Sequence, residues 1–103
     1  LLRDFPRLRM IVAHLGGYHM WELVQEYLVG RDVWFDLSYT FDRAADEVIR
    51  RIGSAHGWER VVWGSDFPWM RQSEALEGLM RLGLDDGTLE GVLAGNLKRL
   101  LNL

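Results

Sequence analysis

The chain has 103 residues, a formal net charge of −3, 49% hydrophobic residues and no cysteine. A chain of this length makes one domain or a piece of a larger one. The mild acidity gives no support for a nucleic-acid partner, which would show a clustered basic face. The lack of cysteine excludes a disulfide scaffold and a thiolate metal site. No apolar run reaches the length of a membrane span and no segment resembles a signal peptide. The absence of cysteine fits a reducing cytoplasm, where we expect the protein.

Three short apolar stretches predict the strands. They span Arg9–Ala13, Val33–Leu37 and Arg60–Trp63, are rich in Val, Ile, Phe and Trp, and lack strict polar alternation. That composition is typical of parallel strands that are covered on both faces.

Helical patterns follow each of these stretches. In the first helix the expected C-cap is Gly30, and one face carries Tyr18, Trp21, Val24 and Leu28. In the second, Asp42 is the expected N-cap and Gly53 the expected stop, with a stripe formed by Ala45, Val48, Ile49 and Ile52.

Three further helices are expected after the third strand. The first carries Leu76, Leu79 and Met80, and the second carries Leu89, Val92 and Leu93. The last is short, with Asn96 as its expected cap and Leu97, Leu100 and Leu101 on one face.

The order predicts an α/β fold of three consecutive βα units with right-handed crossovers. Three such units alone would expose the edges and the apolar faces of the outer strands, which invites association. Eight units close into a TIM barrel of about 250 residues, and 103 residues correspond to about three units. We therefore expect residues 1–103 to be a fragment of one TIM-barrel domain, and we expect the isolated chain to form homo-oligomers or aggregates.

Two ionisable residues stand where predicted strands end. His14 follows Met10–Ala13 and precedes Gly16 and Gly17, which allow a tight turn and leave space beside the imidazole. A lone histidine there could simply bond a neighbouring carbonyl. With a pKa near neutrality it could also activate water or shuttle a proton.

Asp66 follows Val61–Trp63 and precedes Phe67, Pro68 and Trp69. A carboxylate at this point is costly to bury unless it is paired, protonated or bound to a cation. It could cap the loop by accepting backbone N–H bonds, as Asp often does in turns. We favour the alternative, a hard oxygen ligand for a divalent metal, because His14 occupies an equivalent strand end.

The remaining candidates carry less. Asp36, at the end of the middle strand, is expected to be a hydrogen-bonding residue that fixes this end of the barrel. Ser38 has no adjacent base in sequence and gives no nucleophile signature. His19 lies close enough to the Gly-Gly turn to line a site, and His56 is expected in a helix or loop.

Four segments in order resemble the C-terminal part of the amidohydrolase-related family, a group of metal-dependent TIM-barrel hydrolases and decarboxylases similar to aminocarboxymuconate-semialdehyde decarboxylase. They are the strand that leads into His14-Leu15-Gly16-Gly17, Val33–Ser38, Trp63–Trp69 and Gly95–Leu101. The resemblance covers essentially the whole chain. It implies strands 6–8 of a (β/α)8 barrel.

The resemblance also implies roles for individual residues. Asp66 matches an aspartate after the eighth strand that is a metal ligand and proton acceptor. His14 matches a histidine after the sixth strand that acts on water or substrate, and Asn96 matches a structural asparagine. The family's other ligands, a His-x-His pair and a further histidine, would precede this chain. The implied cofactor is a divalent metal, zinc by expectation, which usually needs three or more protein ligands.

Three hypotheses follow. The first is the C-terminal part of a metal-dependent hydrolase or non-oxidative decarboxylase. It would act on a small carboxylate, amide, ester or lactone through a metal-activated water, and would be inactive without the N-terminal part of the barrel. The second is a non-catalytic, self-associating α/β module in which His14 and Asp66 are structural caps. A weaker third is a doubly wound phospho-acceptor domain, which would show clustered acidic residues after its first strand, where this chain has His14.

Overall fold

The computed structural model describes residues 1–103 and confirms an α/β chain with three parallel strands. The strands are β1 (Ile11–Val12), β2 (Trp34–Asp36) and β3 (Val61–Val62), in the sheet order β1-β2-β3. Val12 pairs with Phe35, which in turn pairs with Val61. Because all three strands run in parallel, the residues that follow them meet at one edge, here called the carboxyl end of the sheet.

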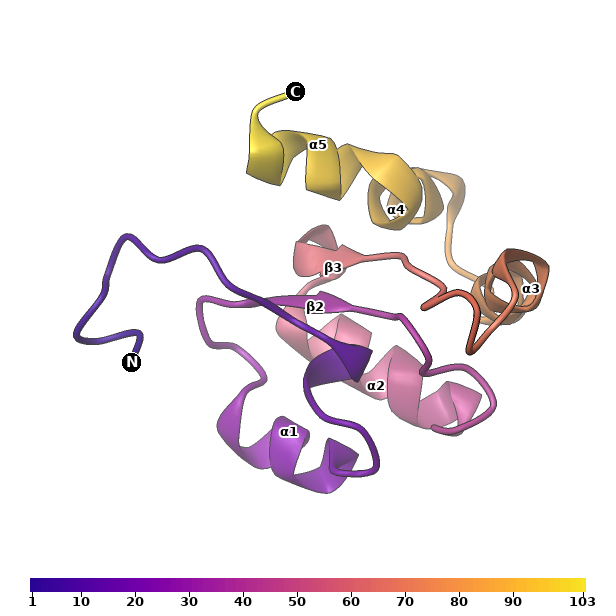
Figure 1. The fold of residues 1–103 in the computed structure, drawn as a ribbon, viewed down its shortest axis with the longest axis horizontal. Coiled ribbons are helices and arrows are strands. Elements are labelled where there is room, and N and C mark those ends of the chain that lie inside the picture. The colour runs from indigo at the N-terminus through magenta and orange to yellow at the C-terminus, as the bar shows by residue number, and fades with distance from the viewer.

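Helices surround this small sheet (Figure 1). They are α1 (Trp21–Tyr27), α2 (Asp46–His56), α3 (Gln72–Arg81), α4 (Asp86–Glu90) and α5 (Asn96–Leu101). Three short turns complete the order: η1 (His14–Gly16), η2 (Trp58–Arg60) and η3 (Gly91–Gly95). In the view of Figure 1, α2 lies behind the strands, while α4 and α5 run along the top, beside β3. No helix combines the length and apolar character that crossing a membrane requires.

The hydrophobic core lies between the sheet and the helices behind it. Phe35 of β2 is fully buried at its centre, and the fully buried side chains of Ile49 and Ile52 reach it from α2, with Leu79 from α3. Burying one such side chain stabilises the fold by roughly 1.5–3 kcal/mol. The βα arrangement is therefore stabilised mainly by helices packed against the middle strand.

The strands are shorter than the predicted apolar stretches. Only Ile11 and Val12 of the stretch 9–13 pair with a neighbour, and Ile11 remains 42% exposed. Apolar composition reports burial by helices as well as strand pairing, so it overestimates how far the ladder extends.

The first helix differs from its prediction at both ends. Tyr18 lies outside it, in a turn where Met20 N–H donates to Gly17 O, and the helix starts at Trp21. It ends at Tyr27, so the expectation that Gly30 is its C-cap is wrong. Gly30 has φ of 84° and donates its N–H to Nδ1 of His56 at 3.0 Å. The glycine shapes the loop into β2, which is a tertiary role.

Both predicted boundaries of α2 are also wrong. The N-cap is Ala45, whereas Asp42 lies in a preceding turn with φ of 65° and pairs with Arg81 at 3.0 Å. Gly53 does not stop the helix but lies inside it. The residue has no side chain because the Trp58 ring occupies that space. A Cβ on Gly53 would lie 2.3 Å from that ring. The helix ends at His56, before Gly57.

The last three elements form one continuous helical segment, so the prediction that Asn96 caps a separate helix is wrong. Asn96 has helical backbone angles and a buried side chain. Its N–H donates to Gly91 O, one residue further back than in an α-helix, which makes η3 a π-turn. The carbonyl of Val92 therefore lacks this helical partner and accepts the N–H of Trp63 at 3.0 Å, just beyond β3.

Candidate functional site

Unusual backbone conformations gather at the carboxyl end of the sheet. Seven residues other than glycine have a positive φ. Six of them lie in the loops that follow β1, β2 and β3: His14, Leu15, His19, Tyr39, Asp42 and Asp66. Each such residue costs roughly 1 kcal/mol or more, and strain of this kind concentrates at functional sites. The two residues singled out in the sequence are both among them.

His14 is held by the end of the middle strand. Its Nδ1 lies 2.8 Å from the carbonyl oxygen of Ser38 and 3.3 Å from the Ser38 hydroxyl. A carbonyl only accepts, so Nδ1 carries the proton and Nε2 keeps its lone pair in the neutral ring. The indole of Trp21 donates to His14 O at 3.0 Å and fixes the backbone. His14 is thus an oriented imidazole with Nε2 as its basic nitrogen.

Asp36 and Ser38 organise the end of β2. The Asp36 carboxylate accepts the N–H of Ser38, which confirms the structural role expected for Asp36. Ser38 is buried and serves as the anchor of His14. Because His14 donates through Nδ1, that nitrogen cannot act as a base toward the Ser38 hydroxyl, in line with the missing nucleophile signature.

Asp66 begins the turn that follows β3. The turn is closed by the Asp66 main-chain carbonyl, which accepts the N–H of Trp69 at 2.9 Å, and by the Ser65 hydroxyl, which accepts the N–H of Phe67 at 3.3 Å. The carboxylate takes no part in these bonds, so it is not the loop cap that one interpretation of the sequence required. Asp66 is exposed and is followed by the exposed rings of Phe67 and Trp69.

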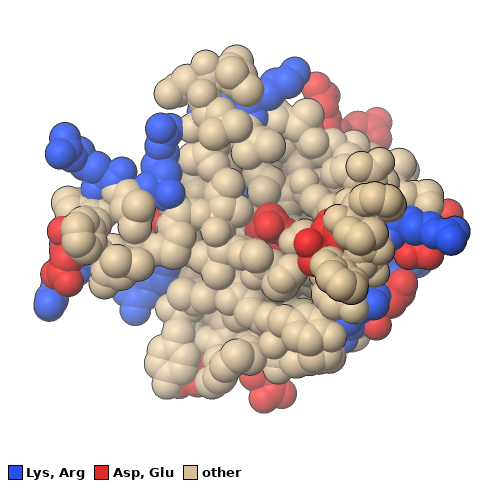
Figure 2. Space-filling model, viewed as in Figure 1, with Lys and Arg blue, Asp and Glu red and all other residues tan.

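His14 and Asp66 therefore follow two outer strands at the same end of one sheet, with Asp36 and Ser38 between them. Gly64 closes the row, since a Cβ on it would lie 3.5 Å from Ser38 and 3.9 Å from Asp36. The face drawn in Figure 2 is largely uncharged, with charged side chains around its rim and acidic atoms near its middle. No group of three or more His, Asp or Glu side chains in the chain is placed to hold a metal ion.

An aromatic group lies beside His14 that the sequence pattern does not predict. The rings of Tyr18 and Tyr39 stack at 5.6 Å, and each meets the His14 ring edge-on, at 6.2 and 6.3 Å. Helical periodicity assigns Tyr18 to the first helix instead. The sequence could have indicated Tyr39 only through its position just after the middle strand, because loops at that end of a parallel sheet line the site.

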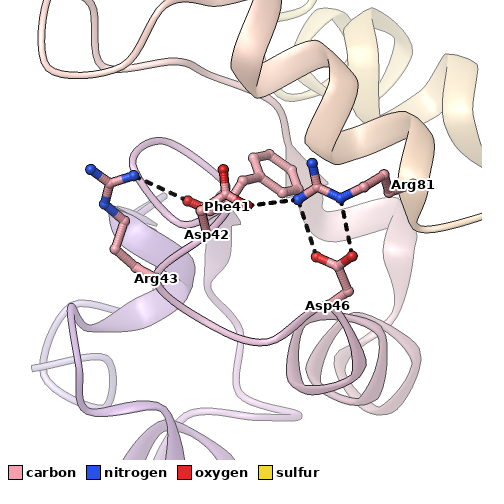
Figure 3. A network of polar contacts seen from close by, with 5 residues as sticks. All are labelled: Phe41, Asp42, Arg43, Asp46 and Arg81. Atoms are coloured by element: carbon pink, nitrogen blue, oxygen red, sulfur yellow. Dashed lines mark hydrogen bonds and ion pairs between the residues drawn. The ribbon is translucent and has the colours of Figure 1, made fainter.

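A cation lies over this aromatic group. Cζ of Arg43 is 4.0 Å from the centroid of the Tyr39 ring. Contact with the side chain of Tyr39, and more weakly Tyr18, raises the pKa of Arg43. Figure 3 shows that the Arg43 side chain extends away from Arg81, which bonds Asp46 through Nε at 3.2 Å.

The largest cavity, about 540 Å³, lies between the start of α1 and the start of α2. Arg43, His19 and Trp21 are among the residues that line it. Neither His14 nor Asp66 lines this cavity. His14 is linked to it through the ring of Tyr39 and the guanidinium of Arg43.

Polar side chains at the opposite, amino end of the sheet are fully occupied. His56 donates from Nε2 to Val33 O at 2.8 Å and accepts from Gly30, and burial lowers its pKa. Asn96 donates to the carbonyls of Trp58 and Val61, at 2.8 Å each. The position expected for His56, in a helix or loop, is confirmed. Its burial is not part of that expectation, although it continues the buried stripe Ile49–Ile52 by one turn.

Solved structures of enzymes share this fold. The chain is 17% identical to 5-carboxyvanillate decarboxylase from Sphingomonas paucimobilis, with a TM-score of 0.75 over 99% of this chain and 36% of that one. For 2,6-dihydroxybenzoate decarboxylase from Rhizobium the values are 15%, 0.77, 98% and 36%. For a dihydroxybenzoic acid decarboxylase from a Polaromonas species, whose structure holds manganese and 2-nitroresorcinol, they are 17%, 0.75, 99% and 36%.

The chain thus spans about a third of the length of these enzymes, and at such identities the likeness concerns the fold. No curated protein matches the sequence. The amidohydrolase family model, in contrast, matches residues 1–103 without interruption. The resemblance seen in the sequence is therefore confirmed, and the chain belongs to the amidohydrolase family.

Proposed function

We propose that this chain is the C-terminal part, strands 6–8, of a metal-dependent barrel enzyme that hydrolyses or decarboxylates a small organic substrate. The observation that carries the proposal is the placement of His14 and Asp66 in positive-φ conformations at the same end of a parallel sheet. The family match supports the enzyme class, and the manganese in the Polaromonas structure supports a divalent metal.

His14 has the geometry of a proton-transfer residue. Its Nδ1–H is committed to Ser38 O, which fixes the ring plane and leaves Nε2 to take or return a proton. The indole N–H of Trp21 donates to the main-chain carbonyl of His14 and holds its backbone. General acid–base catalysis by a positioned imidazole typically accelerates a reaction roughly 10²- to 10⁴-fold.

Asp66 has the chemistry of a metal ligand. Its carboxylate is a hard oxygen donor that the loop's own hydrogen bonds leave available. His14 and Asp66 together supply at most two ligands, so in this proposal the others come from the preceding part of the barrel. A bound divalent metal would supply Lewis acidity and lower the pKa of a coordinated water. The sequence expectation of zinc remains a prediction.

The proposal is tested in the full-length protein with Asp66→Asn. This change keeps the shape of the side chain and removes its charge, so metal content and turnover are expected to fall together, turnover by about three orders of magnitude or more. Metal analysis of the purified variant and steady-state kinetics are the measurements. Asp42→Asn, an exposed acidic residue in a neighbouring loop, is the matched control and should keep both. Full metal content and turnover in Asp66→Asn would contradict the proposed role.

The partner implied by this function is the preceding part of the barrel, with self-association of the isolated chain as the alternative. Ile11 leaves the edge of β1 exposed, and an apolar hollow of about 480 Å³ beside it is lined by Met10, Val12 and Val33 among others. We expect sedimentation of residues 1–103 alone to show oligomers, because unpaired strand edges promote association. A compact monomer would contradict this part of the proposal.

A further inference from the structure

Arg43 is a cation without a carboxylate partner beside the candidate site. The structure has five ion pairs and none includes Arg43. Its one hydrogen bond to the main chain is from Nη1 to Phe41 O, at 3.4 Å. The acidic neighbour in sequence, Asp42, is bonded instead to Arg81 at 3.0 Å (Figure 3). The loop therefore holds its own carboxylate away from Arg43.

The surroundings of Arg43 orient the guanidinium. The Tyr39 ring supports it from below at 4.0 Å, and Tyr18 stacks on Tyr39. A guanidinium lying over an aromatic ring keeps the N–H groups on its edge free, in the planar fork that matches a carboxylate. Tyr39 has φ of 49°, a strained backbone conformation for a residue other than glycine, and this conformation orients the ring.

The position of Arg43 relates it to both the cavity and His14. It lines the 540 Å³ cavity together with the rings of His19 and Trp21. On the other side, Tyr39 also meets the imidazole of His14, so one aromatic ring separates that imidazole from the guanidinium. A ligand group bound by Arg43 would therefore be separated from the atoms that His14 acts on by about the width of one aromatic ring.

We propose that Arg43 is a specificity-determining residue, which binds a carboxylate of the substrate while Tyr39 and Tyr18 form the shelf beneath it. Paired forks of this kind bind carboxylates through two parallel, charge-assisted hydrogen bonds. The inference rests on the proposed function in taking the carboxyl end of the sheet as the active site. The anion-binding step itself needs neither metal nor turnover.

The test measures ligand binding by calorimetry in the full-length protein, with benzoate as the charged probe and benzamide as a neutral probe of the same shape. Arg43→Met keeps an apolar stem over Tyr39 and removes the charge. We expect benzoate to bind about 10- to 100-fold more weakly to this variant, and benzamide to bind within about twofold of its original affinity. Arg43→Lys should lie between, because it keeps the charge and loses the fork.

Two controls distinguish the loss of this one guanidinium from a general loss of positive charge or of the metal. Arg51→Met removes a second arginine of the same cavity, one that is already paired with Glu47 at 3.5 Å, and should leave benzoate binding unchanged. Chelator treatment should leave the difference in benzoate affinity between the original protein and Arg43→Met unchanged, since the metal proposal can fail without affecting this one. Unaltered benzoate affinity in Arg43→Met would overturn the inference. An equal loss for benzamide would overturn it as well, and so would a difference that disappears on chelation.

Discussion

The two ends of the sheet use histidine in opposite ways. At the amino end, His56 is buried and both ring nitrogens have partners, Val33 O and the N–H of Gly30. At the carboxyl end, His14 is half-buried and commits only Nδ1, to Ser38 O. The same side chain is a structural crosslink in one place and carries a free basic nitrogen in the other. The second ring nitrogen of His56 is occupied and that of His14 is not, which is why the proposed proton transfer falls to His14.

The backbone follows the same division. Loops at the amino end reach positive φ with glycine, at Gly30 (84°), Gly57 (102°) and Gly83 (69°), where the conformation costs little. Loops at the carboxyl end, where Gly16 (92°) also lies, place His14, Tyr39 and Asp66 in that region as well, against their intrinsic preference. Positive-φ residues other than glycine concentrate at functional sites, so this pattern agrees with the function proposed for the carboxyl end.

At the carboxyl end, a large effect on activity is expected from His14→Asn in the full-length protein. The loss of Nε2 as a base is expected to reduce turnover by roughly 10²–10⁴, with metal content largely kept. The melting temperature should change little, because Asn can retain one bond to Ser38 O. Kinetics, metal analysis and calorimetry are the measurements. Loss of the metal from His14→Asn, with Asp66→Asn tolerated, would contradict the roles given to His14 and Asp66.

At the amino end the largest expected effect is on stability. Asn96→Leu removes the donor that serves the carbonyls of Trp58 and Val61 and the acceptor for Arg99. Two carbonyls are left without that donor, so we expect a loss of about 2–4 kcal/mol in the free energy of unfolding. Denaturant titration measures it, with Lys98→Ala, exposed on the same helix, as the control expected within about 0.5 kcal/mol. A change below about 1 kcal/mol would show that water replaces the side chain.

His56 predicts a pH dependence of stability. Burial lowers its pKa in the folded state below the ordinary value of 6.5, so the unfolded chain binds a proton more readily than the folded one. The free energy of unfolding should therefore be highest above pH 6.5 and fall as the pH drops through 6.5 toward the lowered pKa. Urea titrations across this range measure the slope. His56→Gln should flatten it, whereas His19→Gln, an exposed histidine, should not.

The smallest effect concerns the glycines of the amino end. Gly30→Ala meets no atom within 4 Å of the new Cβ, so its expected destabilisation of about 1 kcal/mol comes from the backbone angle alone. Gly87→Ala, inside α4, is the matched control and should be neutral or slightly stabilising. Equal effects for the two variants would mean that the loop relaxes to a negative φ.

The sequence is sufficient where one local signal decides the outcome. Apolar runs locate the three strands, and the polar residues directly after them, His14 and Asp66, stand out from that position alone. The same reasoning locates α3 and places Asp36 in a structural role. These features depend on neighbours in the chain, so they are readable without an alignment.

The features that the sequence does not predict depend on contacts between distant residues. Gly53 resembles a helix stop because nothing local shows that the Trp58 ring fills its side-chain position. Arg43 lies over Tyr39 of its own loop, and Tyr39 stacks with Tyr18, a ring from another loop. Asn96 resembles a cap because asparagine favours helix ends, yet its amide reaches carbonyls 35 and 38 residues away. Local propensity ranks such residues correctly only when tertiary packing agrees with it.

The π-turn η3 gives the end of the chain an unusual part in the sheet. By bonding Asn96 N–H to Gly91 O, it releases the carbonyl of Val92 to the N–H of Trp63. The helical segment thereby supplies one main-chain hydrogen bond that a neighbouring strand would otherwise supply. Sliding the C-terminal helix by a single residue would break a rung of the ladder and the amide clamp of Asn96 together. The same hydrogen bonds therefore fix both the register of that helix and the end of β3.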